Sequence, residues 1–386
     1  MRILVVLSRV PWPLEKGDKL RAYHLMREWS EHHKIYLFCL SDKAVHPIAE
    51  SKLNEICERV VIHRLPKLQL LLRLFIGLFN KLPFQVNYFY SKKAKRSFDK
   101  FLDQVIPDHI FCQLARTAEY TLDYSVITKS LDYMDAFSTG MLRMSEKATW
   151  PLSAVMRVEY NRLKNYEEQI QSSFRSRFII SNQDRTQLNY VENLEVVPNG
   201  IDPIFLQKNK EIDKKFDILF TGNMSYRPNV ESAKWLVNEI MPMVWRENPN
   251  AIVCLCGANP SNQVKSLASK KVHVTGWVDD LSIVYQTSKV FIAPMIVNTG
   301  LQNKLLEAMA CHIPSITTTL ANNALGATDK KEILIADSSV ELAKCISQLL
   351  EDKSLSSKLG KNGHDYVTQN FSWIRSAETF EERFKI

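Results

Sequence analysis

The chain has 386 residues, of which 45% are hydrophobic and 24% are charged, and its formal net charge at pH 7 is +8. This length is more than one hydrophobic core usually serves and suits two domains, while the composition excludes a mainly disordered chain. The positive charge indicates an anionic partner. Nucleic acid is disfavoured, because the sequence has no RNP-like aromatic motif, no zinc-finger spacing and no long Arg-rich tract.

The sequence predicts a cytoplasmic protein that does not cross a membrane. No segment reaches the roughly 18 to 20 uninterrupted apolar residues that a membrane span needs. The opening MRILVVLS is interpreted as a strand, since it is too short for a signal peptide and no small-residue cleavage pattern follows. Seven cysteines without a CxxC pair or metal-ligand spacing predict buried thiols in a reducing compartment.

Short β-branched runs alternate with helical patterns along the chain, which is typical of parallel α/β folds. Continuous apolar runs such as ILVVL and AIVCLC predict strands covered by helices on both faces. Strands are expected at 3–8, 35–40, 60–64, 109–113, 127–132, 178–181 and 194–197, and again at 217–221, 251–256, 272–275, 290–293, 315–318 and 333–336. A polar, lysine-rich stretch between Asp202 and Lys215 predicts the boundary between two doubly wound domains.

The motif GLQNKLLEAMA, residues 300–310, follows the strand ending FIAPM and opens a helix. A helix N-terminus at the carboxyl end of a strand favours anions, because free N–H groups and the positive end of the dipole point outward. Lys304 adds a positive charge, and Glu307 lies one turn further, within reach of the sugar of a nucleotide. The alternative is an amphipathic helix with a solvent-exposed Lys304–Glu307 pair. The candidate nucleotide-binding residues here are Gly300, Leu301, Gln302, Asn303, Lys304 and Glu307.

A second candidate loop is FTGNMSYRPN, which connects a buried strand to a helix starting near Pro228. Gly222 lets the backbone approach a ligand closely. Arg227 could meet a phosphate, and Asn223 lies in the same loop. The alternative is an ordinary connection with a solvated arginine.

A third candidate loop is TGWVDD, where the aromatic Trp277 and the adjacent Val278 suit a planar base. The alternative places Trp277 in the core. Asp279 and Asp280 are interpreted as helix-capping residues and not as a metal site, because no further acid clusters with them.

The first half offers two candidate segments. VPWPLEKGDKLRAYHL follows the first strand, and its Gly17 lies in a loop that enters a helix. The spacing is not GxGxxG, which disfavours a nicotinamide dehydrogenase. In LDYMDAFSTG, Asp132 and Asp135 follow the carboxyl end of a strand, where they would point toward a cleft between domains. The alternative for both is a cap of the next helix, which is the interpretation preferred for Asp132, whereas Asp135 is the candidate catalytic residue.

Taken in order, VVPNGID, the strand–TG–loop, VTGWVDDL, GLQNKLLEAMA and the closing NFSW resemble glycosyltransferase family 4, which has the GT-B fold. RVPWPLEKGDKLRAYHL, LDYMDAFS, RVEYNRLKNYEE, TGNMSYRPN and GLQNK resemble one branch of it most, the sugar transferases of PEP-CTERM and exopolysaccharide systems. The resemblance covers nearly the whole chain.

This resemblance implies two Rossmann-like domains facing across a cleft, an acceptor-binding domain at 1–200 and a nucleotide-sugar-binding domain at 201–365, with a helix in 366–386 that crosses back. It implies retention of anomeric configuration, no metal, and no cofactor besides a UDP- or GDP-linked donor. Glu307 matches the acid that holds the ribose hydroxyls, residues 300–304 match the loop at the diphosphate, and Gly17 matches the N-terminal loop between donor and acceptor. Catalytic roles fall to Asp135, Gly17 and Lys304.

Three features depart from the pattern of the family. Thr299 stands where its first motif glutamate is expected, the usual Arg…Lys pair after the first strand of the second domain is missing, and Asp135 occupies the region of a frequent histidine. Lys304 and Arg227 would therefore have to supply the positive charge at the diphosphate.

The partners expected are a nucleotide-sugar donor, a glycan or lipid-linked saccharide acceptor, and an anionic membrane surface. The membrane contact is expected from the apolar and basic segment Leu65–Arg96, for which packing of an amphipathic helix on its own domain is the alternative. Two other functions stay open, a sugar-nucleotide epimerase of the same fold and a basic, non-enzymatic binding protein.

Overall fold

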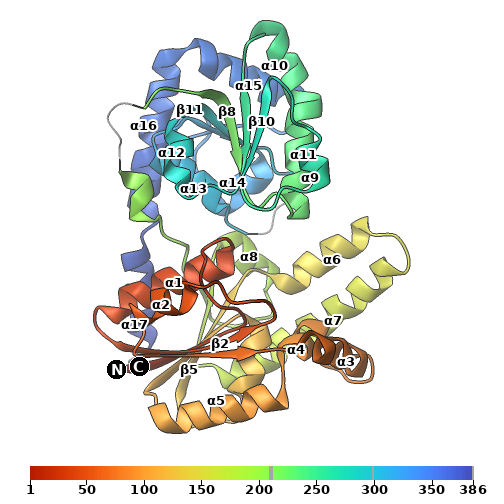
Figure 1. Cartoon of the computed structure of the whole chain (residues 1–386), viewed down its shortest axis with the longest axis vertical. Helices are drawn as coiled ribbons and strands as arrows, with labels where there is room; N and C mark the ends of the chain where they lie inside the picture. Colours follow the sequence, from red (N-terminus) through yellow and green to blue (C-terminus); the bar gives the residue numbers. More distant parts are fainter. Residues whose placement is uncertain (208–211, 298–299, 385–386) are drawn as a thin grey trace. The chain divides into compact units, whose positions relative to one another are not determined.

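The computed structural model describes residues 1–207, 212–297 and 300–384. The chain divides into two compact units, unit 1 with Met1–Pro198 and Ile374–Ile386, and unit 2 with Asn199–Trp373 (Figure 1). The division falls just before the region 202–215 where the sequence predicts it. Each unit has its own parallel sheet and its own hydrophobic core.

Unit 1 contains a seven-stranded parallel sheet in the order β3-β2-β1-β4-β5-β6-β7. The strands are β1 (Arg2–Leu7), β2 (Lys34–Ser41), β3 (Arg59–Arg64), β4 (His109–Gln113), β5 (Thr128–Met134), β6 (Ser176–Ile179) and β7 (Leu194–Val196). The chain leaves β1 toward β2 and β3 and then returns to the other side of β1 with β4. The carboxyl ends of β1 and β4 therefore flank the point where the strand order reverses.

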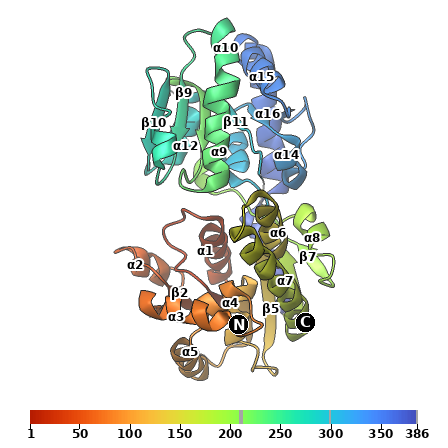
Figure 2. The same cartoon turned by 90° about the vertical axis from the view of Figure 1, so that its right-hand side faces the viewer.

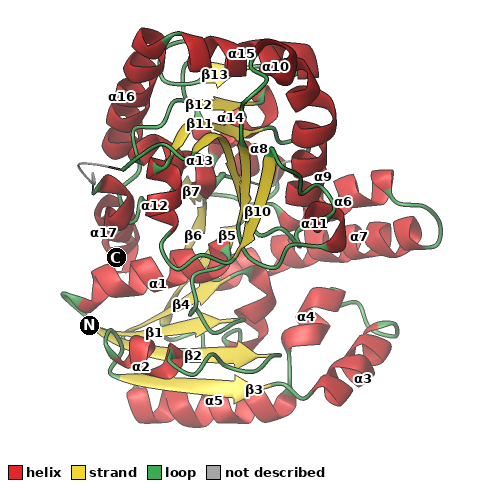
Figure 3. Ribbon diagram, turned by 45° about the horizontal axis from the view of Figure 1, so that its top comes forward, coloured by secondary structure: helices red, strands yellow, loops and turns green. Residues whose placement is uncertain are grey.

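The helices of unit 1 are α1 (Gly17–Ser30), α2 (Ala49–Asn54), α3 (Lys67–Gly77), α4 (Phe84–Phe89), α5 (Lys92–Val105), α6 (Phe137–Lys147), α7 (Leu152–Ile170), α8 (Asn182–Gln187) and α17 (Trp373–Phe384). Short 3-10 turns are η1 (Ala115–Tyr120) and η2 (Gln171–Ser173). The helices α1 and α5 lie on opposite faces of the sheet (Figure 3).

Successive side chains of β4 point to opposite faces of this sheet and pack against different helices. Phe111 packs against Trp29 of α1 and Phe380 of α17, with ring centroids 5.0 Å and 5.5 Å away. Its neighbours Ile110 and Cys112 point to the other face, where they join the core cluster that includes α5. Both faces of the sheet are thus covered, as the continuous apolar strands predict.

Unit 2 contains a six-stranded parallel sheet in the order β10-β9-β8-β11-β12-β13. Its strands are β8 (Phe216–Thr221), β9 (Val253–Cys256), β10 (Val272–Gly276), β11 (Ser288–Ala293), β12 (Ser315–Thr317) and β13 (Leu334–Ile335). All thirteen strands expected from the sequence are present, with ends that differ by at most two residues. The predicted α/β class with two Rossmann-like domains is therefore confirmed.

The helices of unit 2 are α9 (Arg227–Trp235), α10 (Met241–Glu247), α11 (Asn262–Lys265), α12 (Leu281–Gln286), α13 (Asn303–Ala310), α14 (Thr319–Leu325), α15 (Ser339–Glu351) and α16 (Lys353–Asn370). Two short turns complete the unit, η3 (Pro203–Leu206) and the π-helical η4 (Leu236–Ile240), which joins α9 to α10. The helices α9, α10 and α15 pack on one face, and α12, α13 and α16 pack on the other (Figure 1).

The sequence also predicts buried thiols and no segment that crosses a membrane. Five cysteines are buried and two are half-buried, and all seven are free thiols. Among the residues that the structure describes, no helix is both long and apolar enough to span a membrane.

Candidate functional site

The loops at the carboxyl ends of β8, β9 and β10 run against one another through glycines. Gly222 N donates to Cys256 O at 3.0 Å, and Gly257 N donates to Gly276 O at 3.1 Å. Gly222 and Gly257 have φ angles of +152° and +144°, which residues with a Cβ rarely adopt. A Cβ at Gly257 would lie 1.9 Å from Gly222 O. Glycine is therefore required at position 257. At this edge of the sheet, the three glycines have no side chain of their own to cover the backbone.

Lys304 lies in the first turn of α13, directly beside Gly222. Its Nζ donates to Asn229 Oδ1 at 2.6 Å and lies 4.7 Å from the centroid of the Phe220 ring. The residue is only 9% exposed, and burial lowers the pKa of Lys304 to about 7. Within the described part of the chain Lys304 forms no ion pair. The alternative of a solvent-exposed Lys304–Glu307 pair is therefore wrong, because packing against α9 draws the amine inward.

Glu307 lies one turn further along α13 and is half-buried. Its Oε2 accepts a hydrogen bond from the hydroxyl of Tyr285 at 2.8 Å, and Thr221 Oγ1 lies 2.7 Å from the same hydroxyl. The other oxygen, Oε1, accepts no hydrogen bond from the described residues. Burial raises the pKa of Glu307 to about 7. The carboxylate is thus held in one orientation with one oxygen available to a ligand.

The N-terminus of α13 has no side-chain cap. Gln302 precedes the helix, and no hydrogen bond from its side chain caps the described N–H groups of the first turn. Gly300 has a φ of +72°, and Leu301 packs on the core of unit 2. Asn303 Oδ1 accepts from Asn199 Nδ2 at 2.9 Å. The helix is therefore anchored by its neighbours, while its first N–H groups stay available.

The loop after β8 and the start of α9 contribute two predicted residues. Asn223 Oδ1 accepts from the backbone N–H and the hydroxyl of Ser225, at 3.0 Å and 2.7 Å, so its side chain shapes the loop. Arg227 begins α9, is exposed, and forms no hydrogen bond or ion pair with the described residues. Its guanidinium is therefore available to a ligand.

The loop after β10 holds the remaining predicted residues of unit 2. Trp277 is 55% exposed and is therefore not a core residue, while Val278 packs on the core. Asp280 caps α12, since its Oδ1 accepts from Ser282 N at 2.9 Å, which confirms the capping interpretation for Asp280. Asp279 does not cap the helix but accepts from Trp277 Nε1 at 3.2 Å. Thr299 lies outside the described residues.

In unit 1, the interpretation of Asp132 as a helix cap is wrong. Its carboxylate is fully buried and accepts from Arg21 Nε at 2.6 Å and from Arg21 Nη2 at 3.3 Å. Arg21 lies on α1 and is equally buried, with its guanidinium 5.3 Å from the ring centroid of Phe380. A buried guanidinium requires a carboxylate partner, and Asp132 fills this structural role.

Asp135 follows a break in the sheet at the end of β5. The pairing of β5 with β6 shifts register between Asp132 and Met134, and Met134 has a φ of +64°, a strained value for a residue with a side chain. The Asp135 carboxyl is half-buried and accepts no hydrogen bond from the described residues. Burial, followed by the carboxyls of Asp184 and Asp132, raises the pKa of Asp135 well above its usual value. These features fit an acid kept for a substrate.

Gly17 begins α1 at the carboxyl-end edge of the same sheet. A Cβ at this position would meet no described atom within 4 Å, and its φ is outside the left-handed region. The glycine is therefore not required by packing within unit 1.

Sequence reasoning missed three residues that build the site in unit 2, namely Tyr285, Asn229 and Asn199. Tyr285 and Asn229 hold Glu307 and Lys304, and Asn199 holds Asn303. Asn199 and Asn229 lie within motifs already singled out, PNG and YRPN, but their partners are far away in sequence. Only the fold shows these pairings.

Residues 215–352 match the family described as glycosyl transferases group 1. This part of unit 2 is therefore similar to a group 1 glycosyltransferase domain. This match supports a transferase. A relative, described as an uncharacterized 44.6 kDa protein in the cps region of Klebsiella pneumoniae, is 22% identical to the chain, with 100% of the chain and 99% of the relative covered.

Among solved structures, the chain is similar to sucrose-phosphate synthase from Thermosynechococcus elongatus, with 15% identity, a TM-score of 0.73, and 100% and 98% of the two chains covered. It is also similar to HepE from Anabaena in complex with UDP and glucose, with 13% identity, a TM-score of 0.71, and 99% of each chain covered. These similarities show the GT-B fold.

Proposed function

We propose that the protein is a retaining glycosyltransferase that moves a sugar from a nucleoside-diphosphate sugar to a glycan or lipid-linked acceptor. The observation that carries the proposal is the N-terminal half of α13. An uncapped helix N-terminus, the amine of Lys304 and the available Oε1 of Glu307 follow one another along it. A diphosphate at the N-terminus would leave the ribose near Glu307, and the exposed ring of Trp277 suits the base.

The charges support donor cleavage without a metal. Breaking the bond between the sugar and the diphosphate develops negative charge on the leaving group and positive charge on the anomeric carbon. Lys304, the N–H groups of α13 and the exposed Arg227 are placed to stabilise the leaving group in unit 2. Such preorganised charge is usually the largest contribution to catalysis. A diphosphate oxygen on the same face as the acceptor would accept its proton, which gives retention.

For Asp135 we propose a role on the acceptor or on the cationic transition state. Its half-buried carboxyl lies at the carboxyl-end edge of the sheet, directly after the strained residue Met134, and it accepts no hydrogen bond from the described residues. We propose family 4 membership, within the exopolysaccharide-associated branch, on the motifs quoted from the sequence.

The donor is proposed to be UDP- or GDP-linked, which the UDP and UDP-glucose complexes of HepE support for UDP. A thermal-shift screen of nucleotides and nucleotide sugars tests the proposal. We expect stabilisation by one nucleoside diphosphate and its sugars, because a ligand that binds the folded state raises the melting temperature. A flat response to all of them would contradict the proposal.

Analysis of the reaction products distinguishes a glycosyltransferase from the two alternatives, an epimerase and a non-enzymatic binding protein. A transferase consumes donor only with acceptor, whereas an epimerase converts donor alone to an epimer. Salt-sensitive DNA binding without any nucleotide-sugar response would favour the non-enzymatic binding protein. For the transferase we expect NMR coupling constants of the product to show the anomeric configuration of the donor.

We further propose that unit 1 contacts the inner face of an anionic membrane. Exposed apolar side chains lie on and next to α3 and α7, and these two helices lie on the same side of the unit (Figures 1 and 2). Arg162 of α7 joins them, since it donates to the carbonyl oxygens of Gly77 and Leu82 at 2.5 Å and 3.2 Å. The exposed apolar side chains are Leu72, Phe75, Ile76, Leu78 and Phe79 around α3, with Trp150, Leu152, Val155 and Val158 around α7.

Exposed basic residues accompany these apolar side chains. Lys81 follows Phe79, Arg157 lies between Val155 and Val158, and Lys92, Lys93 and Arg96 lie on the first turns of α5. Basic side chains near an anionic surface contribute about 1 kcal/mol each. This combination suits reversible binding to an anionic bilayer.

Sedimentation with liposomes tests the membrane contact. We expect binding to vesicles rich in phosphatidylglycerol and weaker binding to phosphatidylcholine vesicles. Phe75→Ser with Phe79→Ser should reduce the bound fraction severalfold, because these side chains lose apolar area that the bilayer would bury. Val126→Ser, at another highly exposed apolar position, should have no effect. Equal sedimentation with both kinds of vesicle would contradict the contact.

A further inference from the structure

A cluster of basic residues occupies the point in unit 1 where the strand order reverses. Ser8 and Arg9 directly follow β1, and Arg116 lies in η1 after β4. In open parallel sheets, ligands bind at the carboxyl ends of the strands that flank such a point. The residues proposed to bind the nucleotide-sugar donor all lie in unit 2. They give this cluster in unit 1 no role.

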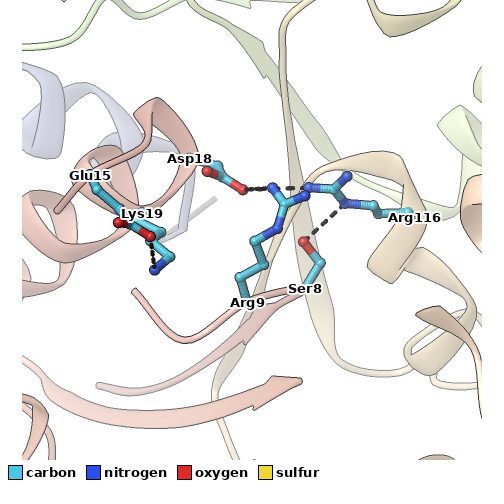
Figure 4. Close-up of polar contacts among 6 residues, drawn as sticks. All are labelled: Ser8, Arg9, Glu15, Asp18, Lys19 and Arg116. Atoms are coloured by element: carbon cyan, nitrogen blue, oxygen red, sulfur yellow. Dashed lines mark hydrogen bonds and ion pairs between the residues drawn. The ribbon is translucent and has the colours of Figure 1, made fainter. Parts of the chain in front are cut away.

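One carboxylate is shared by the two arginines of this cluster (Figure 4). Arg9 Nη1 donates to Asp18 Oδ2 at 2.6 Å, and Arg116 Nη2 reaches the same oxygen at 3.4 Å. Arg116 Nε donates to Ser8 Oγ at 2.9 Å. The guanidinium of Arg116 also lies 4.7 Å and 5.7 Å from the ring centroids of Phe89 and Phe137. The cluster is therefore built from five separate segments of the chain.

Positive charge exceeds negative charge in this cluster. Arg116 is only 7% exposed, and its Nη1 makes no hydrogen bond or ion pair with the described residues. Burial, then Arg9, lowers the pKa of Arg116 to about 9. Burial and Arg9 also lower the pKa of Lys16. A cation whose charged form is disfavoured by burial and by a neighbouring cation gains stability when an anion binds.

The surroundings leave room for that anion. Arg9 retains 29% exposure of its side chain. The helix α1 begins at Gly17 after Lys16, with no side-chain cap from Lys16, and a Cβ on Gly17 would meet no described atom within 4 Å. An oxyanion beside Gly17 would therefore meet the helix N-terminus and the arginines together.

We propose that Arg9, Arg116 and Lys16 bind a phosphate or diphosphate group carried by the acceptor. The proposal rests on the proposed function, since the donor diphosphate already has its own site at α13 in unit 2. The acceptor class that follows is a phosphorylated saccharide or a lipid-diphosphate-linked saccharide, in preference to a neutral glycan. Arginine suits this role because its planar fork binds two phosphate oxygens at once.

Calorimetric titration with inorganic pyrophosphate tests the site, on the full chain with UDP or GDP at saturation to occupy unit 2. We expect Arg9→Gln and Arg116→Gln to weaken pyrophosphate binding at least about tenfold, as loss of a charge-assisted contact implies. The control is Lys19→Gln, which removes the same charge from the neighbouring ion pair with Glu15, whose Oε1 lies 3.3 Å from Lys19 Nζ (Figure 4). This control should bind pyrophosphate like the wild type.

Three results would overturn the proposal. One is unchanged pyrophosphate affinity in Arg9→Gln, a partly exposed position that should keep its melting temperature even if Arg116→Gln does not fold. Another is wild-type pyrophosphate binding that only Lys304→Gln abolishes. The third is displacement of pyrophosphate by UDP or GDP, which would assign the cluster to the donor. If neither nucleotide binds, the donor proposal fails separately, and pyrophosphate binding that depends on Arg9 but not on Lys304 still supports the anion site.

Discussion

Lys304 and Glu307 lie one turn apart on α13, and burial moves their pKa values toward each other. Burial disfavours the charged form of each group, so that it lowers the pKa of Lys304 and raises the pKa of Glu307, both to about 7. A bound nucleotide diphosphate would favour both charged forms. The phosphates favour the protonated amine, and the ribose hydroxyls favour the ionised carboxylate.

We therefore predict that nucleotide affinity is greatest near pH 7 and falls on both sides. Above about pH 7 the Lys304 amine of the free protein loses its proton, and below about pH 7 the Glu307 carboxylate gains one. Calorimetry from about pH 5.5 to about pH 8.5 measures both limbs. Glu307→Gln should flatten the acid limb alone. An affinity that does not change across this range would contradict the assignment of both residues.

Asp135→Asn should leave nucleotide binding nearly unchanged while turnover falls by about 100-fold, a typical contribution of a positioned acid or base. The reason is that Asp135 belongs to unit 1, whereas the nucleotide elements belong to unit 2. Calorimetry and a transfer assay separate these two effects. Wild-type turnover in the variant would remove Asp135 from the mechanism.

Gly17→Ala tests whether the start of α1 faces a ligand. Since no described atom would meet the added methyl group, we expect stability to stay constant or to rise by about 0.4–1 kcal/mol. Activity should fall, because the methyl group would occupy the space left for the substrate. Thermal unfolding and a transfer assay give the two readouts. Full activity in this variant would show that no ligand approaches Gly17.

At the scale of elements, the glycine that follows β9 and the glycine that ends β10 differ in how much space surrounds them. A Cβ on Gly257 would collide with Gly222 O, whereas at Gly276, with a φ of +77°, it would meet no described atom within 4 Å. We expect Gly276→Ala to cost about 1–2 kcal/mol of unfolding free energy, from the left-handed backbone alone. Gly257→Ala should cost about 3 kcal/mol or more, since overpacking adds to the conformational cost. Equal costs in denaturant unfolding would contradict this packing of the loops.

The strands could be predicted from the sequence because their apolar runs are short, β-branched and bounded by polar turns, as in ILVVL and AIVCLC. The helix of GLQNKLLEAMA was predicted for a similar local reason. The side-chain partners could not be predicted. Lys304 of this helix is bound by Asn229, and Asp132 of unit 1 is bound by Arg21. Such pairs depend on which loops the topology brings to one edge of a sheet, and local periodicity carries no signal for them.

For the whole molecule, the resemblance of the ordered motifs supplied the fold that periodicity alone could not specify. Alternating strands and helices predict two doubly wound units, but many protein classes share that arrangement. The match of residues 215–352 to the group 1 glycosyltransferases and the GT-B neighbours agree with the resemblance. Function therefore has to be tested at the site that α13 builds.

Calorimetric titration of the full chain with UDP and GDP, in wild type and in Glu307→Ala, tests that site most directly. Two charge-assisted hydrogen bonds to the ribose predict a loss of about 2–4 kcal/mol, or roughly 30-fold to 1,000-fold in affinity. Glu351→Ala, an exposed acid at the end of α15, should bind like the wild type, and unchanged melting temperatures would show that both variants fold. Unchanged affinity of Glu307→Ala for the nucleotide that the wild type binds would contradict the donor site.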